Sequence, residues 1–184
     1  MKRRWLFWLP FALVLILLGL LLYGLRKPVD NTIASRMVGK PLPEFTAPPA
    51  LPGQPGAATG DYRQGKPRLI NIFASWCVPC VVEIPVLLRL KAMGVQVDGI
   101  AVHDTRPALE AFLAKNGNPY ARIGSDDQSR IQLALGSAGV PETFVVDGKG
   151  IIVHRHICVV SERDIPQLLA LLGTAGRLFA AAPA

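Results

Sequence analysis

The sequence predicts an α/β sandwich with a mixed central sheet, preceded by one N-terminal transmembrane helix. Three observations predict it. Short apolar runs typical of strands alternate with helical segments beyond residue 67, two late strands flank a tight turn at 147–150, and residues 5–25 carry no charged side chain. The 184 residues suffice for one folded domain with a buried core. Three cysteines are too few, and odd in number, for a disulfide framework.

The uncharged segment at residues 5–25 has the length of a membrane-spanning helix. At roughly 1.5 Å per residue it matches the hydrocarbon layer of about 30 Å. A basic pair at 26–27 follows it directly, whereas a cleaved signal peptide has a shorter apolar region followed by small residues; residues 32–34 are a weaker candidate cleavage site. Three basic residues at 2–4 favour an N-terminus in the cytoplasm and a folded domain on the other side, in a bacterium the periplasm.

The net charge of +7 is concentrated around this segment. Five of the 20 Lys and Arg residues lie within 1–27, which holds no acidic residue, and the rest of the chain has 15 basic and 13 acidic residues. Residues 28–184 contain no basic run, so the charge pattern gives no support to nucleic-acid binding as a function. We therefore divide the chain into a cytoplasmic N-terminus and membrane anchor at 1–27, a linker at 28–37, a folded domain at 38–175 and a tail at 176–184.

The first regular elements of the domain follow an irregular entry. Residues 28–67 are rich in Pro and Gly, which suits a tether and loops with one short extended piece at 42–45. Residues 68–74 (RLINIFA) form a short apolar run with Ile and Phe, typical of a buried strand. Apolar residues at helical spacing then predict a helix over 77–93.

The middle of the domain continues the alternation of strands and helices. Residues 95–102 predict a second strand, and a helix over 107–115 opens with Pro and closes near Asn-Gly. A short extended piece at 121–123, a helix over 127–135 and a turn between two glycines at 136–139 follow.

The last elements are a hairpin and a helix. Residues 142–146 and 151–156 read as strands, and the Asp-Gly-Lys-Gly turn at 147–150 joins them. An amphipathic helix is expected over 162–172, and residues 180–184 are expected to fray.

A C-x-x-C motif lies between the first strand and the first helix of the domain. Residues 76–80 read WCVPC, and two sulfur atoms at i and i+3 on one helical turn can close a small disulfide ring. Cys77 falls at the helix N-terminus, where unpaired N–H groups and the dipole stabilise a thiolate and lower its pKa. It is the expected nucleophile, and the better shielded Cys80 is expected to resolve a mixed disulfide.

Two other interpretations of the cysteine pair are half a zinc site and a structural disulfide. A zinc site needs two more ligands at matching spacing, and the sequence has no second Cys pair. A structural disulfide gains little stability from closing so small a loop. Redox chemistry is therefore the preferred interpretation.

A second element is Pro141, which opens the strand at 142–146. A proline there cannot donate to a sheet ladder, and a cis bond would leave the backbone groups of Val140 open to an extended peptide beside the disulfide. Alone, it reads equally well as an ordinary turn proline. Together with a C-x-x-C motif at a helix start, it indicates a thioredoxin-type site.

Three stretches stand out when they are taken together: WCVPC with Glu83 and Pro85, GNPY at 117–120 and GVPETFVVDGKGII at 139–152. In combination they resemble the CcmG/DsbE family, membrane-tethered thioredoxin-like proteins of cytochrome c maturation. The likeness extends over about residues 38–172. It implies a thioredoxin-like sandwich with an insertion between the C-x-x-C helix and the cis-Pro strand.

The resemblance also implies a direction of electron flow, reduction rather than oxidation. Such proteins keep apocytochrome c, or a dedicated partner thiol protein, reduced so that haem can be attached. Their electrons come from a membrane thiol reductase of the DsbD or CcdA type. The resemblance implies no cofactor, and it places the chain in the bacterial inner membrane as a single-pass protein with its folded domain in the periplasm.

Site residues are carried over from the family by position. Cys77 is the attacking thiolate, Cys80 the resolving thiol and Pro141 the cis-proline. Trp76 is the flanking surface. Val140 is a candidate binding residue on the separate ground that a cis-proline leaves its backbone groups open.

Two acidic residues, Glu83 and Glu142, match carboxylates near this family's disulfide. Such a carboxylate disfavours a nearby thiolate and tunes the reduction potential; alternatively, both are ordinary solvated carboxylates. Asn71 stands where thioredoxins carry a buried Asp that assists the second thiol. Because an Asn cannot take a proton, Glu83 is the better candidate for proton transfer.

Three residues near the C-terminal hairpin lie outside the motif. We expect Cys158 to be a buried, small hydrophobic residue rather than a redox group. His154 and His156 share one face of a strand and are expected to be a surface pair rather than metal ligands, so no metal is predicted.

Two other functions are alternatives to cytochrome c maturation. A tethered reductase of the TlpA or ResA type would apply the same chemistry to another client, such as a copper-site protein. A copper-binding or delivery module would use the thiols as ligands, although no Met or third ligand lies beside the Cys pair.

Overall fold

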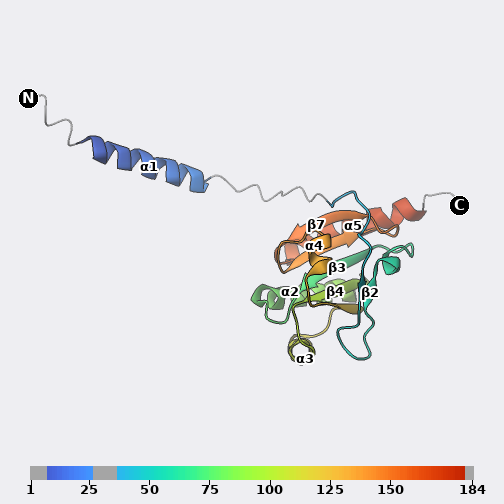
Figure 1. Cartoon of the computed structure of the whole chain (residues 1–184). Coiled ribbons are helices and arrows are strands. Elements are labelled where there is room, and N and C mark those ends of the chain that lie inside the picture. The colour runs from blue at the N-terminus through green and yellow to red at the C-terminus, as the bar shows by residue number, and fades with distance from the viewer. Residues whose placement is uncertain (1–7, 27–36, 181–184) are drawn as a thin grey trace, which may run out of the picture. The chain divides into compact units, whose positions relative to one another are not determined.

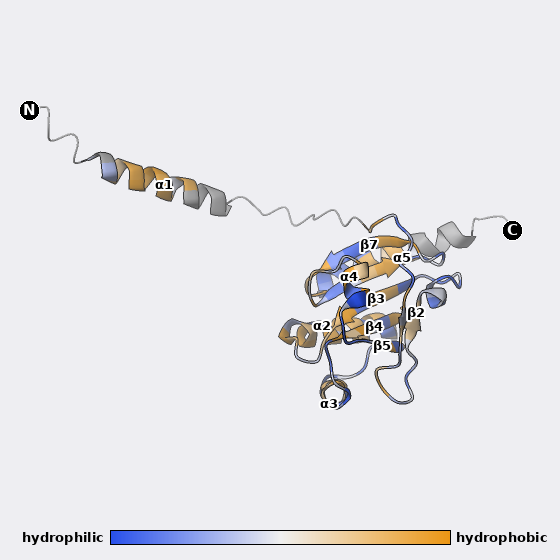
Figure 2. Ribbon diagram, viewed as in Figure 1, coloured by the Kyte–Doolittle hydropathy of each residue, from blue (hydrophilic) through white to orange (hydrophobic). Residues whose placement is uncertain are grey.

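The computed structural model describes residues 8–26 and 37–180, in two compact units that divide after residue 34 (Figure 1). The described part of the first unit is a helix, α1 (Leu9–Arg26), and the part of it that Figure 2 colours is mostly apolar. The expected anchor, residues 5–25, begins outside the described residues. Within the described part of the chain, no helix is long and apolar enough to cross a membrane.

The second unit is built on a five-stranded mixed sheet with the order β5-β4-β3-β6-β7. The strands β3, β4 and β5 are parallel to one another, whereas β6 pairs antiparallel with both β3 and β7. Their bounds are Arg68–Phe73 (β3), Val97–Val102 (β4), Arg122–Asp126 (β5), Glu142–Val146 (β6) and Ile152–Ile157 (β7). The prediction of an α/β fold with a mixed central sheet is confirmed.

The described residues of this unit form four α-helices: α2 (Val78–Ala92), α3 (Arg106–Asn116), α4 (Arg130–Ala134) and α5 (Ile165–Ala180). Buried side chains of α2, α3 and α5 form one core with one face of the sheet. The other face packs against the N-terminal loops and α4. Along β3 the two cores alternate, with Leu69 and Phe73 in the first and Ile70 and Ile72 in the second, as the two-residue period of a strand requires.

The N-terminal loops contain two short strands, β1 (Thr46–Ala47) and β2 (Ala57–Ala58), and a 3₁₀ turn, η2 (Thr59–Tyr62). They pack beside the edge strand β5, where Gly124 makes room for them. A Cβ atom at position 124 would lie 2.3 Å from the Cβ of Ala47. The extended piece expected at 42–45 thus lies next to the strand that forms, Thr46–Ala47, rather than within it.

Several element boundaries differ from the sequence-based expectation. The piece expected at 121–123 is a full strand, because its pairing with β4 continues through Gly124 and Ser125, where the apolar pattern has stopped. The helix expected over 127–135 is only α4. The last helix is a 3₁₀ turn, η3 (Glu162–Asp164), followed by α5, which extends to Ala180. Between α2 and β6, the segment in which the resemblance implies an insertion, the chain forms β4, α3, β5 and α4.

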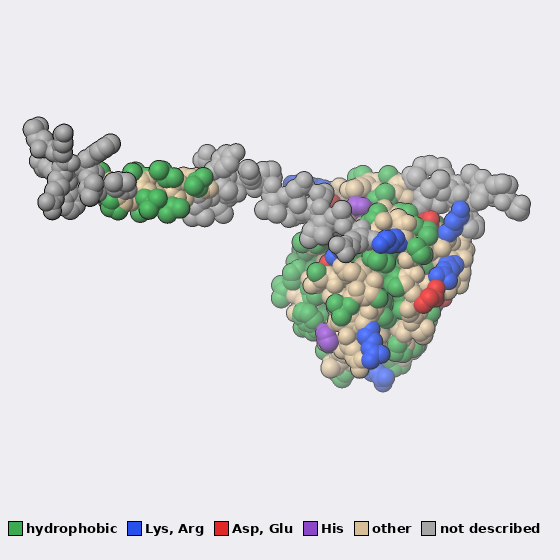
Figure 3. Space-filling view, turned by 45° about the horizontal axis from the view of Figure 1, so that its top comes forward, with side chains coloured by type: hydrophobic (Ala, Val, Ile, Leu, Met, Phe, Trp, Pro, Cys, Tyr) green, Lys and Arg blue, Asp and Glu red, His purple; other side chains and the backbone are tan. Residues whose placement is uncertain are grey.

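The surface of this unit carries scattered charges. On the face seen in Figure 3, basic and acidic side chains are spread over the surface among apolar and neutral groups. That distribution agrees with the near balance of basic and acidic residues beyond residue 27.

Candidate functional site

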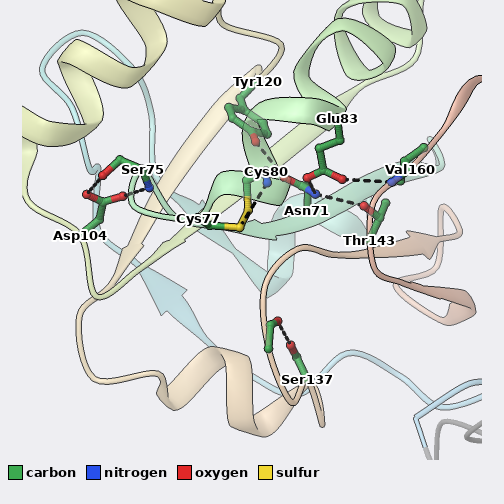
Figure 4. The surroundings of a disulfide bond; sticks show 11 residues. Asn71, Ser75, Cys77, Cys80, Glu83, Asp104, Tyr120, Ser137, Thr143 and Val160 are labelled. Atoms are coloured by element: carbon green, nitrogen blue, oxygen red, sulfur yellow. Dashed lines mark hydrogen bonds between the residues drawn. A yellow bond between two sulfur atoms is a disulfide. The ribbon is translucent and has the colours of Figure 1, made fainter.

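The C-x-x-C motif forms a disulfide at the point where β3 leads into α2 (Figure 4). The Cα atoms of Cys77 and Cys80 lie 5.3 Å apart, and Cys77 is the N-cap residue of the helix. The Cys77 Sγ accepts a hydrogen bond from the backbone N–H of Cys80 at 3.2 Å. The first sulfur therefore meets one of the unpaired donors of the helix start, an arrangement that stabilises a thiolate once the disulfide opens.

The peptide bond between Val140 and Pro141 is cis. It borders an apolar groove of about 430 Å³. Pro79, from within the C-x-x-C motif, lines the same groove, as do Ile157 and Cys158 at the end of β7. The disulfide helix, the proline loop and the end of the hairpin thus share one surface hollow.

Trp76 lies beside the disulfide with 59% of its surface exposed. Its indole N–H donates to the backbone carbonyl of His103 at 3.1 Å. Such an exposed, oriented ring provides apolar contact area for a partner.

Glu83, one turn beyond Cys80 on α2, is fully buried. Its carboxylate accepts hydrogen bonds from the Asn71 side-chain amide at 2.9 Å and from the Val160 backbone N–H at 3.3 Å. Burial raises the Glu83 pKa to about 7, and the two hydrogen bonds oppose part of that rise. A solvated surface carboxylate is therefore the wrong interpretation of Glu83.

Asn71 links Glu83 to two further buried side chains (Figure 4). Its amide N–H group also donates to Thr143 Oγ1 at 3.1 Å, and its carbonyl oxygen accepts from the Tyr120 hydroxyl at 2.8 Å. Burial, and then the charge of Glu83, raise the Tyr120 pKa well above its ordinary value, so the hydroxyl stays a donor. The site thus rests on a polar network drawn from β3, α2, β6 and the segment before β5.

Glu142 is also buried, but it faces a cation. Both of its oxygens accept from the Arg155 guanidinium, at 2.8 and 2.9 Å, and the backbone N–H of Ala138 donates to one of them at 3.2 Å. The pair ties the start of β6 to β7 and to the loop before Pro141. A charge neutralised in this way has less influence on a thiolate than a free carboxylate has.

The expectation for Cys158 was wrong. Cys158 is a free, exposed thiol with a φ of 76°, directly after β7 ends at Ile157. Because the chain turns out of the sheet there, the side chain is not packed into either core.

His156 is half-buried, with one ring nitrogen 3.2 Å from the Val159 carbonyl. Among the residues that the structure describes, no group of three or more His, Cys, Asp or Glu side chains could hold a metal ion.

The exposure of Cys158 leads to a prediction about alkylation. In the oxidised protein a maleimide reagent should modify one cysteine per chain, because the other two form the disulfide. After reduction and unfolding, three should react. Mass spectrometry of intact protein and of its peptides measures both numbers. An oxidised chain that takes up no label in its native state would contradict an exposed Cys158.

The sequence analysis did not predict the hydrogen-bond partners of Asn71 and Glu142, because only the fold brings those partners close to them. Tyr120 and Thr143 lie 49 and 72 residues from Asn71 along the chain. Arg155 has no spacing relation to Glu142 that a motif would show. The one usable signal was Tyr120, the last residue of the GNPY stretch that carries the family resemblance.

Comparisons with known proteins agree with this geometry. The Redoxin family model matches residues 37–172. The chain is 40% identical over 161 residues to the thiol:disulfide interchange protein DsbE of Pseudomonas fluorescens, with 87% of this chain and 88% of the relative covered. It is 37% identical over 172 residues to the thiol:disulfide interchange protein HelX of Rhodobacter capsulatus, with 92% and 97% covered.

A solved structure supports the fold. The crystal structure of a putative thiol:disulfide interchange protein DsbE from Chlorobium tepidum superposes with a TM-score of 0.62 at 22% identity, covering 76% of this chain and 97% of that one. The fold is thioredoxin-like, and the matched relatives share its thiol:disulfide chemistry. The chain is a protein-disulfide oxidoreductase, and it belongs to the CcmG/DsbE family of Redoxin-domain proteins.

Proposed function

We propose that this oxidoreductase works as a reductase, which opens the disulfide of apocytochrome c, or of its partner thiol protein, before haem attachment. One observation supports the exchange chemistry: the Cys77–Cys80 pair opens a helix beside an apolar groove, one helical turn before a buried carboxyl whose pKa is about 7. The reductive direction and the client are what membership of the CcmG/DsbE family implies. The names of the relatives, thiol:disulfide interchange proteins, support the exchange chemistry.

The reaction begins with the reduced pair. The Cys77 thiolate attacks one sulfur of the client disulfide, so that a bond forms between Cys77 and the client while the client S–S bond breaks and its other sulfur leaves as a thiolate. Cys80 then loses its proton and attacks the Cys77 sulfur. This step closes the Cys77–Cys80 disulfide and releases the second client thiolate. The client gains two electrons, and the protein ends in its disulfide form.

The groove beside Pro141 supplies the client's binding place. Its lining is apolar, and it extends from Pro79 to the end of β7. An extended client segment lying in it would bring its own cysteine next to Cys77, with Val140 and Trp76 as contact residues on either side. The fixed position of the two sulfurs relative to the groove then selects which client sulfur is attacked.

Glu83 is the proposed proton acceptor for Cys80. A carboxyl with a pKa of about 7 is partly ionised at neutral pH, so it can take the thiol proton as Cys80 attacks and lose it afterwards. Asn71 and the Val160 N–H fix the direction of the carboxyl. Glu142, paired with Arg155, instead shapes the loop before Pro141.

The proposed location is the periplasm, on a tether to the bacterial inner membrane. The uncharged sequence at 5–25 and its flanking basic residues support an anchor within 1–27, with a linker at 28–37, the folded domain at 38–175 and a tail at 176–184. An oxidising compartment requires a source of electrons, and a membrane thiol reductase of the DsbD or CcdA type fits that need.

A trapping experiment tests the proposal. Cys80→Ser leaves the nucleophile in place but removes the thiol that resolves the mixed disulfide, so Cys77 should stay joined to its client. Purification of the adduct from detergent-solubilised membranes, followed by mass spectrometry, identifies the partner. We expect apocytochrome c or the maturation thiol protein. Capture of many unrelated secreted proteins, or of a copper-site protein alone, would overturn the proposed client.

A further inference from the structure

The two residues before Cys77, Ser75 and Trp76, are held by the loop that follows β4. The strands β3 and β4 are parallel neighbours, with Phe73 paired to Ala101, so their carboxyl ends reach the same edge of the sheet. Ser75 and Trp76 therefore meet His103 and Asp104 directly after both strands end.

Asp104 makes the tighter of these contacts. Its carboxylate accepts hydrogen bonds from the Ser75 backbone N–H at 2.5 Å and from the Ser75 hydroxyl at 2.6 Å (Figure 4). A third donor, the backbone N–H of Thr105, fixes the carboxylate from its own side at 2.9 Å. Charge-assisted hydrogen bonds of this kind are stronger than neutral ones.

Ser75 and Trp76 are the central residues of a tight turn. The Ala74 carbonyl accepts the Cys77 backbone N–H at 3.2 Å, which closes the turn and delivers Cys77 to the N-cap position of α2. A carboxylate that binds both the amide and the hydroxyl of Ser75 fixes the first half of this turn. The conformation of this turn then sets the position of the Cys77 sulfur.

Trp76 depends on the same loop. Its side chain is largely exposed, so packing restrains it little, and its indole N–H donates to the His103 carbonyl. His103 has a φ of 48°, a left-handed conformation that is uncommon for a residue with a side chain and that the surrounding contacts must hold in place. Because Asp104 follows directly, its bonds to Ser75 also keep the His103 carbonyl in place.

We infer that Asp104 is a positioning residue for thiol exchange: through Ser75 and Trp76 it fixes the nucleophile Cys77 and the aromatic surface beside it. Asp104 does not touch the sulfur atoms in this role. The inference goes beyond the proposed function, because it concerns exchange with any disulfide or thiol and does not depend on the identity of the client.

The test uses the full chain with Trp5 and Trp8 replaced by Phe, which leaves Trp76 as the single tryptophan. Stopped-flow fluorescence follows the reduction of the Cys77–Cys80 disulfide by dithiothreitol, and anisotropy decay reports the local motion of Trp76. Asp104→Ala should slow the exchange about tenfold, since misplacement of a reacting group by about 1 Å can cost up to 100-fold. It should also speed the local rotation of Trp76.

Two variants separate positioning from charge and from general damage. Asp104→Asn keeps an oxygen that accepts the Ser75 N–H, so its exchange rate should return to within about threefold of the parent protein. Asp127→Asn is the matched control, an exposed carboxylate that lines the same surface cavity as Asp104 and accepts from Ser125 instead. It should change neither rate nor anisotropy.

Three results would overturn the inference. They are an Asp104→Ala rate and Trp76 anisotropy equal to those of the parent, an Asp104→Asn rate as slow as that of Asp104→Ala, and an equal loss in Asp127→Asn. If Asp104→Ala does not fold, Ser75→Ala takes its place. That variant removes the hydrogen bond from the Ser75 hydroxyl to Asp104 but keeps the one from the Ser75 backbone N–H. We expect disulfide exchange to be about threefold slower. An unchanged exchange rate would count against the role of Asp104.

Discussion

Cys77→Ser is expected to lower disulfide exchange more than about a thousandfold. A serine hydroxyl is not ionised at neutral pH and does not attack a disulfide sulfur, so the first step of the reaction has no nucleophile. The position of Cys77 as the N-cap of α2, with its sulfur accepting the Cys80 N–H, is what makes it the attacking group. Turnover of a model disulfide substrate by the reduced protein measures the loss.

Cys80→Ser is the matched comparison, because it makes the same substitution one helical turn away. Both variants should lose turnover, but only Cys80→Ser should form a stable mixed disulfide with the substrate. Both are best made with Cys158→Ser, since that exposed thiol could form adducts of its own. If Cys77→Ser instead accumulates the mixed disulfide and Cys80→Ser does not, the two cysteines have the opposite roles.

Most of the fold could be predicted from the sequence, because most strands of this domain are short, apolar and separated by helices. The motif at 76–80 located the redox site, since it requires only two residues at a spacing that local geometry fixes. The edge strand β5 was harder to recognise. Gly124 and Ser125 lack the apolar side chains of a strand, and their conformation is set by pairing with β4 and by contact with Ala47.

The buried polar network below the disulfide could not be read from the sequence. Asn71, Tyr120 and Thr143 lie far apart along the chain, and each residue type is common on protein surfaces. Only the register of β3 against β6, which places Asn71 opposite Thr143, brings them together beneath α2. The error at Cys158 has the same origin, because its exposure depends on where β7 ends and not on the residue type.

Burial explains why Glu83 keeps its proton to a higher pH than a solvated glutamate does, and the network offsets only part of that effect. Every polar atom of the Asn71 side chain has a hydrogen-bond partner. Its amide group donates to Glu83 but brings no positive charge near the carboxylate. A carboxylate that gains hydrogen bonds without a cation still loses its water on burial. The outcome is a Glu83 pKa of about 7, compared with an ordinary value of 4.5.

This shift predicts that the stability of the folded domain falls as the pH rises. Below pH 4.5 Glu83 is protonated in both the folded and the unfolded chain and contributes no pH dependence. Between pH 4.5 and 7 the unfolded chain loses the proton while the folded chain keeps it, so the free energy of unfolding decreases. The loss is complete only about one pH unit above the folded-state pKa and amounts to about 3 kcal/mol.

Glu83→Gln removes this dependence, because an amide does not titrate. Urea unfolding of the oxidised protein at pH 5 and pH 8 gives the free energy of unfolding at each pH. The parent protein should lose about 2.5 kcal/mol more than Glu83→Gln between the two, since at pH 5 the unfolded chain has already lost part of the Glu83 proton. Any constant cost of replacing one carboxylate oxygen by an NH₂ group beside the Val160 N–H cancels in that difference.

Glu110→Gln is the control, since Glu110 is an exposed glutamate of α3 that remains solvated in both states. It should keep the parent's difference in the free energy of unfolding between pH 5 and pH 8.

Glu83→Gln should also change the kinetics of the resolving step. In the parent, the rate at which reduced Cys80 attacks a Cys77 mixed disulfide should rise with pH, and in the variant this rise should be flatter, because the proposed proton acceptor is gone. A Glu83→Gln protein with the parent's pH dependence in both measurements would remove Glu83 from the mechanism and from the titration of the fold.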